Sequence, residues 1–328
     1  MDSHHSAQPL LGIALKVGST LAFTCMATLI KLVSARYPVG ELVFFRSLFA
    51  LVPVFVWVGW RDHTMRAVID VFRTERLGSH VIRSGVGVAA MFLGFAALAN
   101  LPIADATAIG YASPLLTVVF AAVLLHERVH FFRWTAVIIG LCGVLVMLSD
   151  YAAPGLDGGQ VHERSLLGAS FSVAAATVGA LAATYTRTLT RYEAAATIVV
   201  YFSSLSALFA ILTIPLGSVW PEMAWNWPSG VDAVALVIAG IFGGIGQVLM
   251  TQSYRFGDAS TIAPFDYTSM IWVLIVSVVV FGTWPSPTIL VGTVIVISAG
   301  LFVIWREHRL GIERTRSKRA QTPTTPLS

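Results

Sequence analysis

Apolar residues in this chain gather in long blocks, each about twenty residues long and separated from the next by a short polar segment. An α-helix rises about 1.5 Å per residue, so one block spans roughly 30 Å, the thickness of the hydrocarbon core of a bilayer. The pattern predicts ten membrane-spanning helices, at 9–33, 38–60, 79–99, 105–125, 132–149, 165–187, 195–216, 231–253, 259–281 and 285–305. The predicted fold class is an all-α polytopic membrane protein.

The fourth predicted span combines a proline with a face of small residues. Asp105 stands where it can cap the helix, and Pro114 near the middle of the span deletes one ladder hydrogen bond and bends the helix. In lipid, a neighbouring helix or a water-filled cavity has to satisfy the freed carbonyl. Small and hydroxyl side chains recur on one face at helical spacing: Ala106, Gly110, Ser113 and Thr117. We therefore expect a kinked helix with a cavity-lining side, and Tyr111 beside that side.

A weaker copy of this stretch occurs in the second half of the chain. Asp105-Ala-Thr-Ala-Ile corresponds to Asp258-Ala-Ser-Thr-Ile, and each is followed by a proline, Pro114 or Pro264, and an apolar run. Each half holds five predicted spans, and an odd number inverts the second half relative to the first. We predict two inverted five-helix repeats, 11–148 and 166–304, followed by a basic tail at 305–328, with a substrate site between the repeats near the midplane.

The composition excludes a soluble domain. The chain is 56% hydrophobic and 12% charged, with a mean hydropathy of +0.78, whereas a soluble domain has about twice that charged fraction. Both cysteines, Cys25 and Cys142, fall inside apolar blocks, so the sequence indicates neither a disulfide framework nor a metal cluster. We expect no metal and no cofactor.

The basic residues are distributed unevenly between the two sides of the predicted spans. Three of the 21 lysines and arginines lie on one side, namely Lys31, Arg36 and Arg164. Most of the others lie on the opposite side: Arg61, Arg66, Arg73, Arg76, Arg128, Arg133, Arg187, Arg191, Arg255, Arg306, Arg309, Arg314, Arg316, Lys318 and Arg319. The positive-inside rule then places both termini in the cytoplasm of a multi-pass protein in the cell (inner or plasma) membrane. The basic tail is interpreted as an orientation signal beside anionic lipid, and no nucleic-acid partner is expected.

Charged residues inside the spans are the sharpest functional clue, since one at mid-membrane costs about 3 kcal/mol or more unless it is paired or hydrated. Arg46 in the second span and Asp266 in the ninth lie at similar depth. One interpretation is a static ion pair between them that holds the halves together. The other is that Arg46 binds a substrate carboxylate and Asp266 carries a coupling proton.

The candidate site extends to further residues, each with a structural alternative. Arg83 could be an interfacial anchor, and the tyrosines could serve packing. The candidate substrate-binding residues are Arg46, Tyr111, Ser113, Tyr267, Gln247, Lys16 and Arg83. The candidate proton-coupling residues are Asp266 and Glu41, and the expected helix kinks are at Pro114 and Pro264.

Three motifs resemble the EamA branch of the drug/metabolite transporter superfamily. They are Phe-Phe-Arg-Ser-Leu-Phe-Ala in the second span, Leu-Pro-Ile-Ala-Asp-Ala-Thr-Ala-Ile in the fourth, and Pro-Leu-Leu followed by His-Glu-Arg. The resemblance implies a ten-helix fold with inverted halves that transports small metabolites by alternating access. Where the family often has Gly-Glu, this chain has His126-Glu127, and its second copy, Gly282-Thr283, lacks the acid. Glu127 is therefore interpreted as a structural group at a helix end.

These observations predict a secondary active transporter, either exporter or importer. The sequence lacks His-Glu-x-x-His, Gly-x-Ser-x-Gly and Gly-x-x-x-x-Gly-Lys-Ser/Thr motifs, which argues against an enzyme and against an ATP-driven pump. Basic residues outnumber acidic ones inside the spans, which favours an anionic or zwitterionic metabolite such as an amino acid or a related compound. The alternatives are a vitamin or nucleotide-like metabolite of the riboflavin or S-adenosylmethionine type, and a membrane-embedded enzyme or scaffold. The expected partners are a small metabolite and the lipid bilayer, and whether the chain forms a homo-oligomer is left open.

Overall fold

The computed structural model describes residues 9–62, 71–124, 126, 129, 131–152, 159–189, 192–256 and 262–321. In this part of the chain every regular element is a helix. The first half contains α1 (Pro9–Val33), α2 (Val39–Asp62), α4 (Leu77–Asn100), α5 (Ile103–Gly110), α6 (Ala112–Leu124) and α7 (Phe131–Ala152). The second contains α8 (Gly159–Leu189), α9 (Ala195–Ile211), the short 3₁₀ helices η1 (Ile214–Ser218) and η2 (Pro221–Met223), α10 (Gly230–Phe256), the 3₁₀ helix η3 (Ala263–Tyr267), α12 (Thr268–Val279) and α13 (Pro287–Gln321).

Most predicted spans correspond to a helix that is long and apolar enough to cross a membrane, and the described residues contain nine such stretches. The ninth predicted span, 259–281, differs. Its apolar helix, Phe265–Val279, is shorter. The 3₁₀ turn η3, with Pro264 as its second residue, leads into this helix. Proline has no N–H to donate, which suits the start of a helix and not its interior. Residues 258–261, which carry the first part of the second-half copy, lie outside the described residues.

The fourth span is interrupted as expected, but three residues before its proline. α5 ends at Gly110 and α6 begins at Ala112, with Tyr111 between them. In an unbroken helix, the nitrogen of Pro114 would bond to the carbonyl of Gly110, so the break appears where that bond is missing. The predicted cap is wrong: Pro102 precedes α5, and the Asp105 carboxylate accepts a hydrogen bond from the Tyr151 hydroxyl of α7 instead.

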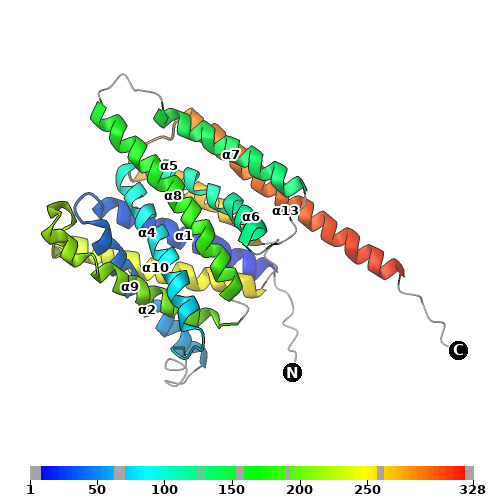
Figure 1. Cartoon of the computed structure of the whole chain (residues 1–328), viewed down its shortest axis with the longest axis horizontal. Helices are drawn as coiled ribbons and strands as arrows, with labels where there is room; N and C mark the ends of the chain where they lie inside the picture. The colour runs from blue at the N-terminus through cyan, green and yellow to red at the C-terminus, as the bar shows by residue number, and fades with distance from the viewer. Residues whose placement is uncertain are drawn as a thin grey trace.

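Helices from the two halves alternate in the bundle (Figure 1). α1 packs on α10, α10 on α2, α2 on α9, α9 on α4, and α4 on α8. The pair α7 and α13 lies side by side along one flank, and the end of α13 extends beyond the bundle (Figure 1). Because the halves are interleaved, a site at the centre draws residues from both.

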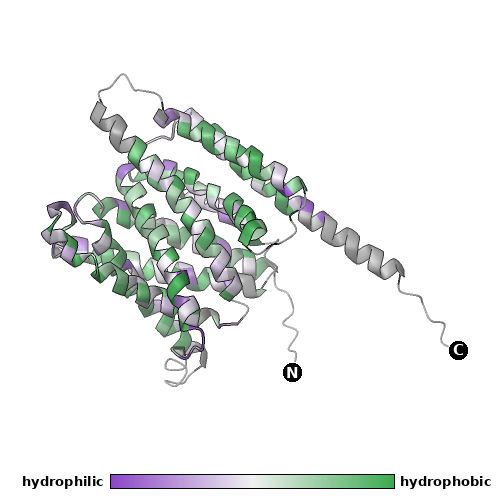
Figure 2. Cartoon of the chain, viewed as in Figure 1, coloured by the Kyte–Doolittle hydropathy of each residue, from purple (hydrophilic) through white to green (hydrophobic). Residues whose placement is uncertain are grey.

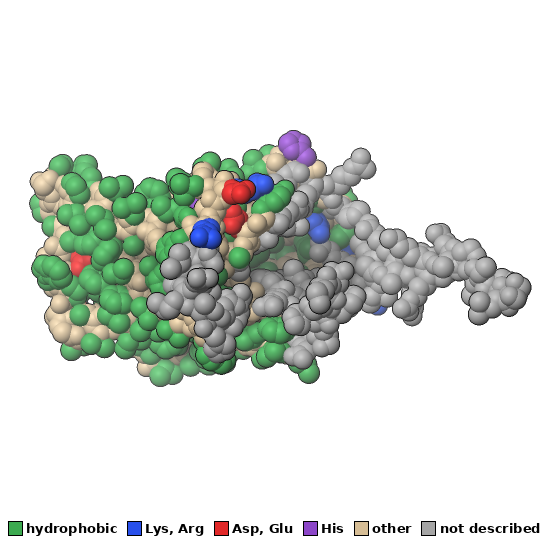
Figure 3. Space-filling view, turned by 90° about the horizontal axis from the view of Figure 1, so that it is seen from below, with side chains coloured by type: hydrophobic (Ala, Val, Ile, Leu, Met, Phe, Trp, Pro, Cys, Tyr) green, Lys and Arg blue, Asp and Glu red, His purple; other side chains and the backbone are tan. Residues whose placement is uncertain are grey.

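Apolar side chains fill the interior and also face outward. Buried Ile30, Ile109, Leu236 and Ile289, from α1, α5, α10 and α13, belong to one continuous core. Hydrophobic residues run along all the long helices (Figure 2), and in the view from below they cover most of the described surface (Figure 3). An apolar outer surface is what a bilayer requires, and the chain is a multi-pass membrane protein.

Glycines allow the closest helix contacts on α10. A Cβ atom added at Gly240 or Gly244 would meet backbone atoms of α2, and one at Gly246 would lie 2.8 Å from the ring of Phe23 in α1. At Gly85 and Gly94 of α4, by contrast, a Cβ atom would meet nothing within 4 Å. The small residues of α10 therefore serve close packing, as expected for membrane helices, whereas these two positions of α4 leave space.

Candidate functional site

A buried lysine and an aspartate form an ion pair at the junction of α1 and η3. Lys16 Nζ lies 2.6 Å from Asp266 Oδ1. The two side chains differ sharply in exposure, 2% for Lys16 and 45% for Asp266. The aspartate therefore faces open space and the lysine does not.

Hydroxyl and aromatic groups surround this pair. The Tyr111 hydroxyl lies 2.6 Å from Ser269 Oγ, and the rings of Tyr111 and Tyr267 meet edge to face with centroids 5.3 Å apart. Thr20 Oγ1 lies 3.0 Å from Thr268 Oγ1. The break after Gly110 and the 3₁₀ turn η3 thus bring Tyr111 and Tyr267 together, beside Asp266.

The ion pair that the sequence suggested, Arg46 with Asp266, is not the one that forms. Asp266 is held by Lys16. The similar depths of Arg46 and Asp266 were counted from the ends of regular helices, but Asp266 lies in a 3₁₀ turn. The rotation around each helix axis, which decides which charges meet, cannot be read from depth.

Arg46 and Arg83 form a second cluster, against one aromatic ring. The Cζ atoms of Arg46 and Arg83 lie 5.9 and 4.1 Å from the centroid of the Phe202 ring. Arg46 is 4% exposed, and its Nε and Nη1 have no hydrogen-bond partner among protein groups. Arg83 Nε donates to Thr186 Oγ1 at 2.9 Å, while its Nη1 has no partner. Among the described residues no carboxylate pairs with either arginine.

Three buried serines lie on the same helices as this cluster. Ser47, Ser84 and Ser203 follow Arg46, Arg83 and Phe202 directly in the sequence. All three are fully buried, and none of their hydroxyls has a hydrogen-bond partner within the described part of the chain. Buried polar groups are almost always paired, so a concentration of unpaired donors requires an explanation such as a bound anion or water.

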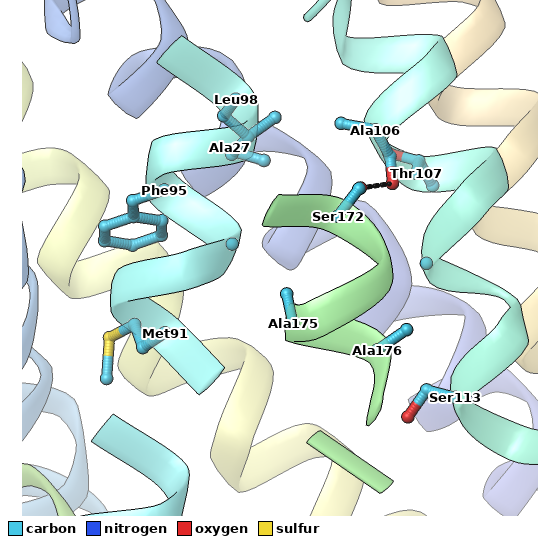
Figure 4. Close-up of a pocket in the computed structure, with 12 residues that line it drawn as sticks. Ala27, Met91, Phe95, Leu98, Ala106, Thr107, Ser113, Ser172, Ala175 and Ala176 are labelled. Atoms are coloured by element: carbon cyan, nitrogen blue, oxygen red, sulfur yellow. Dashed lines mark hydrogen bonds between the residues drawn. The ribbon is translucent and has the colours of Figure 1, made fainter. Parts of the chain in front are cut away.

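A cavity of about 290 Å³ lies between α1, α4, α5, α6 and α8 (Figure 4). Ala106, Gly110 and Ser113 line it, as predicted for this face of the fourth span, whereas Thr117 of the same predicted face is not among the lining residues. Across the cavity, Ser172 of α8 donates to the carbonyl of Ala106 at 3.0 Å. The lining is mostly small or apolar, with hydroxyls as its polar groups.

Two predicted site residues lie apart from these clusters. Glu41 faces a pocket between the start of α2 and the segment before α10. Gln247 is half-buried on α10, next to Gly246, which abuts Phe23. Glu127 lies outside the described residues.

Polar groups also join the helices at the two ends of the bundle. Beyond the start of α2, Arg36 and Tyr37 both bond to Asp232 at the start of α10, at 2.7 and 3.0 Å. Beyond the end of α2, Thr74 donates to Glu193 at 2.6 Å, and His80 at the start of α4 lies 3.8 Å from the same carboxylate. The first link joins the connection before α2 to the start of α10. The second joins the connection before α9, which carries Glu193, to the region where α4 starts.

Sequence reasoning missed Phe202 and the three serines. One signal was present: the dipeptide Arg-Ser occurs in both α2 and α4, as Arg46-Ser47 and Arg83-Ser84. Serine alone is common in membrane helices, where it usually bonds to its own backbone. Only the structure shows that these three serines do not bond to their own backbone.

Comparison with known proteins gives one family across the whole chain. The EamA-like transporter family matches residues 10–149 and 166–305. An S-adenosylmethionine uptake transporter of Rickettsia felis is 23% identical over 300 residues, which cover 92% of this chain and 94% of that one. A riboflavin transporter of Vibrio cholerae is 25% identical over 314 residues, 95% and 98% of the two chains. One solved crystal structure shares the fold with a TM-score of 0.58 at 20% identity, covering 91% of this chain and 98% of that one. With two matches that together span most of its length, the chain belongs to the EamA-like transporter family, a family of transporters and not of enzymes.

Proposed function

We propose that this transporter moves a small anionic or zwitterionic metabolite by alternating access, as a secondary active exporter or importer. The observation that carries the proposal is the pair Arg46 and Arg83, which share the Phe202 ring and have no acidic partner among the described residues. A positive charge in a low-dielectric interior is costly, and two that repel each other are more so. A substrate carboxylate or phosphate between them offsets that cost, because guanidinium groups bind such anions in a two-pronged geometry.

The two arginines make the S-adenosylmethionine transporter a better guide to the substrate than the riboflavin transporter. S-adenosylmethionine carries a carboxylate, which a guanidinium can bind, whereas riboflavin has no acidic group. We therefore favour a substrate with a carboxylate or phosphate group, of which an amino acid or an amino-acid derivative is the simplest case.

We further propose that the two halves are inverted repeats, 11–148 and 166–304. In support, equivalent helix pairs pack in the same way: α1 on α10 as α8 on α4, and α2 on α10 as α9 on α4. The polar links at the two ends correspond as well, since Asp232 receives the connection before α2 and Glu193 lies in the connection before α9. Rocking of one half against the other would then open the central site to each side alternately.

Asp266 is our candidate for the coupling residue. Its carboxylate is 45% exposed, so protons can reach it, and it neutralises Lys16, which is buried. Protonation of Asp266 would break the ion pair between η3 and α1, and so couple a proton to a contact between the halves. Glu41 does not touch this pair, and we assign no coupling role to it.

The proposed orientation, with both termini cytoplasmic, predicts the outcome of cysteine labelling. In a Cys-free variant, Glu75→Cys and Ser218→Cys place single thiols at exposed positions near opposite ends of α2. An impermeant maleimide added outside intact cells should label the Ser218→Cys protein and not the Glu75→Cys protein, while both react after the cells are opened. The reverse pattern would overturn the orientation assigned from the basic residues.

The substrate class is tested by thermal shift of the purified protein against metabolites sorted by charge, including S-adenosylmethionine and riboflavin. A ligand at a hundredfold excess over its Kd adds about 2.7 kcal/mol to the free energy of unfolding, a clear rise in melting temperature. We expect the stabilising compounds to carry a carboxylate or phosphate. Stabilisation only by compounds that lack both a carboxylate and a phosphate group would reject the proposed class.

A further inference from the structure

A second pocket lies at the start of α2, separate from the arginine cluster. It has a volume of about 230 Å³ and is enclosed by Glu41, Phe44 and Phe45 of α2 and by the segment that carries Trp225 and Trp227. This is smaller than the roughly 300–1,000 Å³ typical of sites for drug-sized ligands. The pocket therefore suits a small chemical group.

The one charged side chain that lines it is a carboxylate with a single protein partner. Glu41 is 1% exposed, and its Oε2 accepts the backbone N–H of Asn226 at 3.1 Å. Within the described residues, no lysine, arginine or histidine pairs with it. A buried carboxylate without a counter-ion favours a positive ligand.

Four aromatic side chains line the pocket as well, together with Ile214, Asn226 and Pro228. The Phe44 ring lies 5.5 Å from the Phe45 ring and 5.4 Å from the Trp225 ring, measured between centroids. Trp225 is held in place because its Nε1–H donates to Thr213 Oγ1 at 3.1 Å. Rings of this kind attract cations through the negative charge on their faces, above all alkylated ammonium groups whose methyls contact the rings.

We propose that this pocket binds a small organic cation, a substituted ammonium group, with its charge beside the Glu41 carboxylate and its alkyl groups against the rings. A hard metal cation is a poorer fit, because calcium or magnesium requires six or more oxygen ligands and the pocket offers one carboxylate. The ammonium group can belong to a soluble compound or to a choline lipid headgroup at the membrane surface. The proposal stands independently of the anion site at Arg46.

Tetramethylammonium chloride is the probe, titrated calorimetrically into the purified full-length protein with sodium chloride as the ionic-strength control. We expect saturable binding that Glu41→Gln weakens about tenfold or more, because a charge-assisted contact is lost. The matched control Glu222→Gln changes an exposed glutamate in the same loop region and should leave binding unchanged. Phe44→Leu removes a ring without touching the carboxylate, and should also weaken binding.

No saturable binding to the wild-type protein, or equal binding by wild type, Glu41→Gln and Phe44→Leu, would overturn the proposal. If Glu41→Gln does not fold, the Phe44→Leu titration decides. Nanodiscs separate the two sources of the group. Weaker tetramethylammonium binding in phosphatidylcholine than in phosphatidylglycerol nanodiscs assigns the pocket to a lipid headgroup, and equal binding assigns it to a soluble cation.

Discussion

Replacing Arg46 by methionine is expected to abolish transport while leaving the protein at least as stable as the wild type. Arg46 is 4% exposed, with two guanidinium nitrogens unpaired among the described residues, so its removal relieves a desolvation cost that the contact with the Phe202 ring offsets only in part. Methionine fills much of the same space and adapts to irregular gaps. Most substitutions in a protein core instead lower the free energy of unfolding, by about 0.5–3 kcal/mol.

The Arg46→Met protein should lose transport because it no longer binds the anionic group of the substrate. Truncating one partner of a buried charge pair weakens binding by about 2–5 kcal/mol, or roughly thirtyfold to several thousandfold. Arg46→Lys should fall between, since an ammonium keeps the charge but loses the two-pronged contact. Binding of the stabilising metabolite and the melting temperature are measured on the same samples. The control Arg309→Met removes an exposed arginine on α13 and should change neither.

A lower melting temperature for Arg46→Met, with anion binding intact, would show that Arg46 holds the fold and not the ligand. The same pair of measurements applies to Arg83→Met. There the Thr186 contact is also lost, so a smaller gain in stability is expected.

Breaking the Lys16–Asp266 pair should have unequal effects from its two sides. Asp266→Asn takes the negative charge from a lysine that is 2% exposed, whereas Lys16→Met leaves an aspartate that is 45% exposed and that water can reach. Breaking a fully buried pair costs about 3–5 kcal/mol. The half-exposed aspartate lowers our expectation to about 1–3 kcal/mol for Asp266→Asn, with less for Lys16→Met. The double change to Met and Leu should recover most of the loss.

Transport assays distinguish a role of the Lys16–Asp266 pair in proton coupling from a purely structural role. An asparagine cannot titrate, so Asp266→Asn should still exchange substrate across a vesicle membrane but lose its response to an imposed pH gradient. Normal proton-driven transport by the Met/Leu double variant would remove the pair from the mechanism. Equal destabilisation by the two single variants would contradict the difference in burial.

The helices were predictable from the sequence because a bilayer leaves few alternatives. A span must be apolar along its full thickness and must satisfy its own backbone, so α1 begins and ends where the hydropathy pattern put it, at Pro9 and Val33. The interruption near Pro114 was also predictable, since Pro114 has no N–H to donate and the carbonyl of Gly110 loses its helical partner. What failed was the cap at Asp105. That carboxylate bonds to Tyr151 of a different helix, a contact between residues far apart in the chain.

The charged residues inside the spans could be predicted from the sequence, but not which of them lie together. Mid-span charge singled out Lys16, Arg46 and Asp266 correctly as unusual, because charge in lipid is expensive wherever it lies. Which of them meet depends on rotation about each helix axis and on the 3₁₀ turn that carries Asp266. Hydropathy encodes neither quantity. In the structure Asp266 pairs with Lys16, while Arg46 lies beside Arg83 and Phe202.

We propose that Arg46 and Arg83 bind the carboxylate or phosphate of a metabolite that the protein carries across the membrane without ATP. The most direct measurement is uptake of the anion that stabilises the purified protein most, into vesicles that contain wild-type protein, Arg46→Met protein or no protein. We expect uptake by the wild type alone, driven by a concentration or pH gradient. Equal uptake by the Arg46→Met protein, or uptake by the wild type of only compounds that lack a carboxylate and a phosphate, would overturn the proposal.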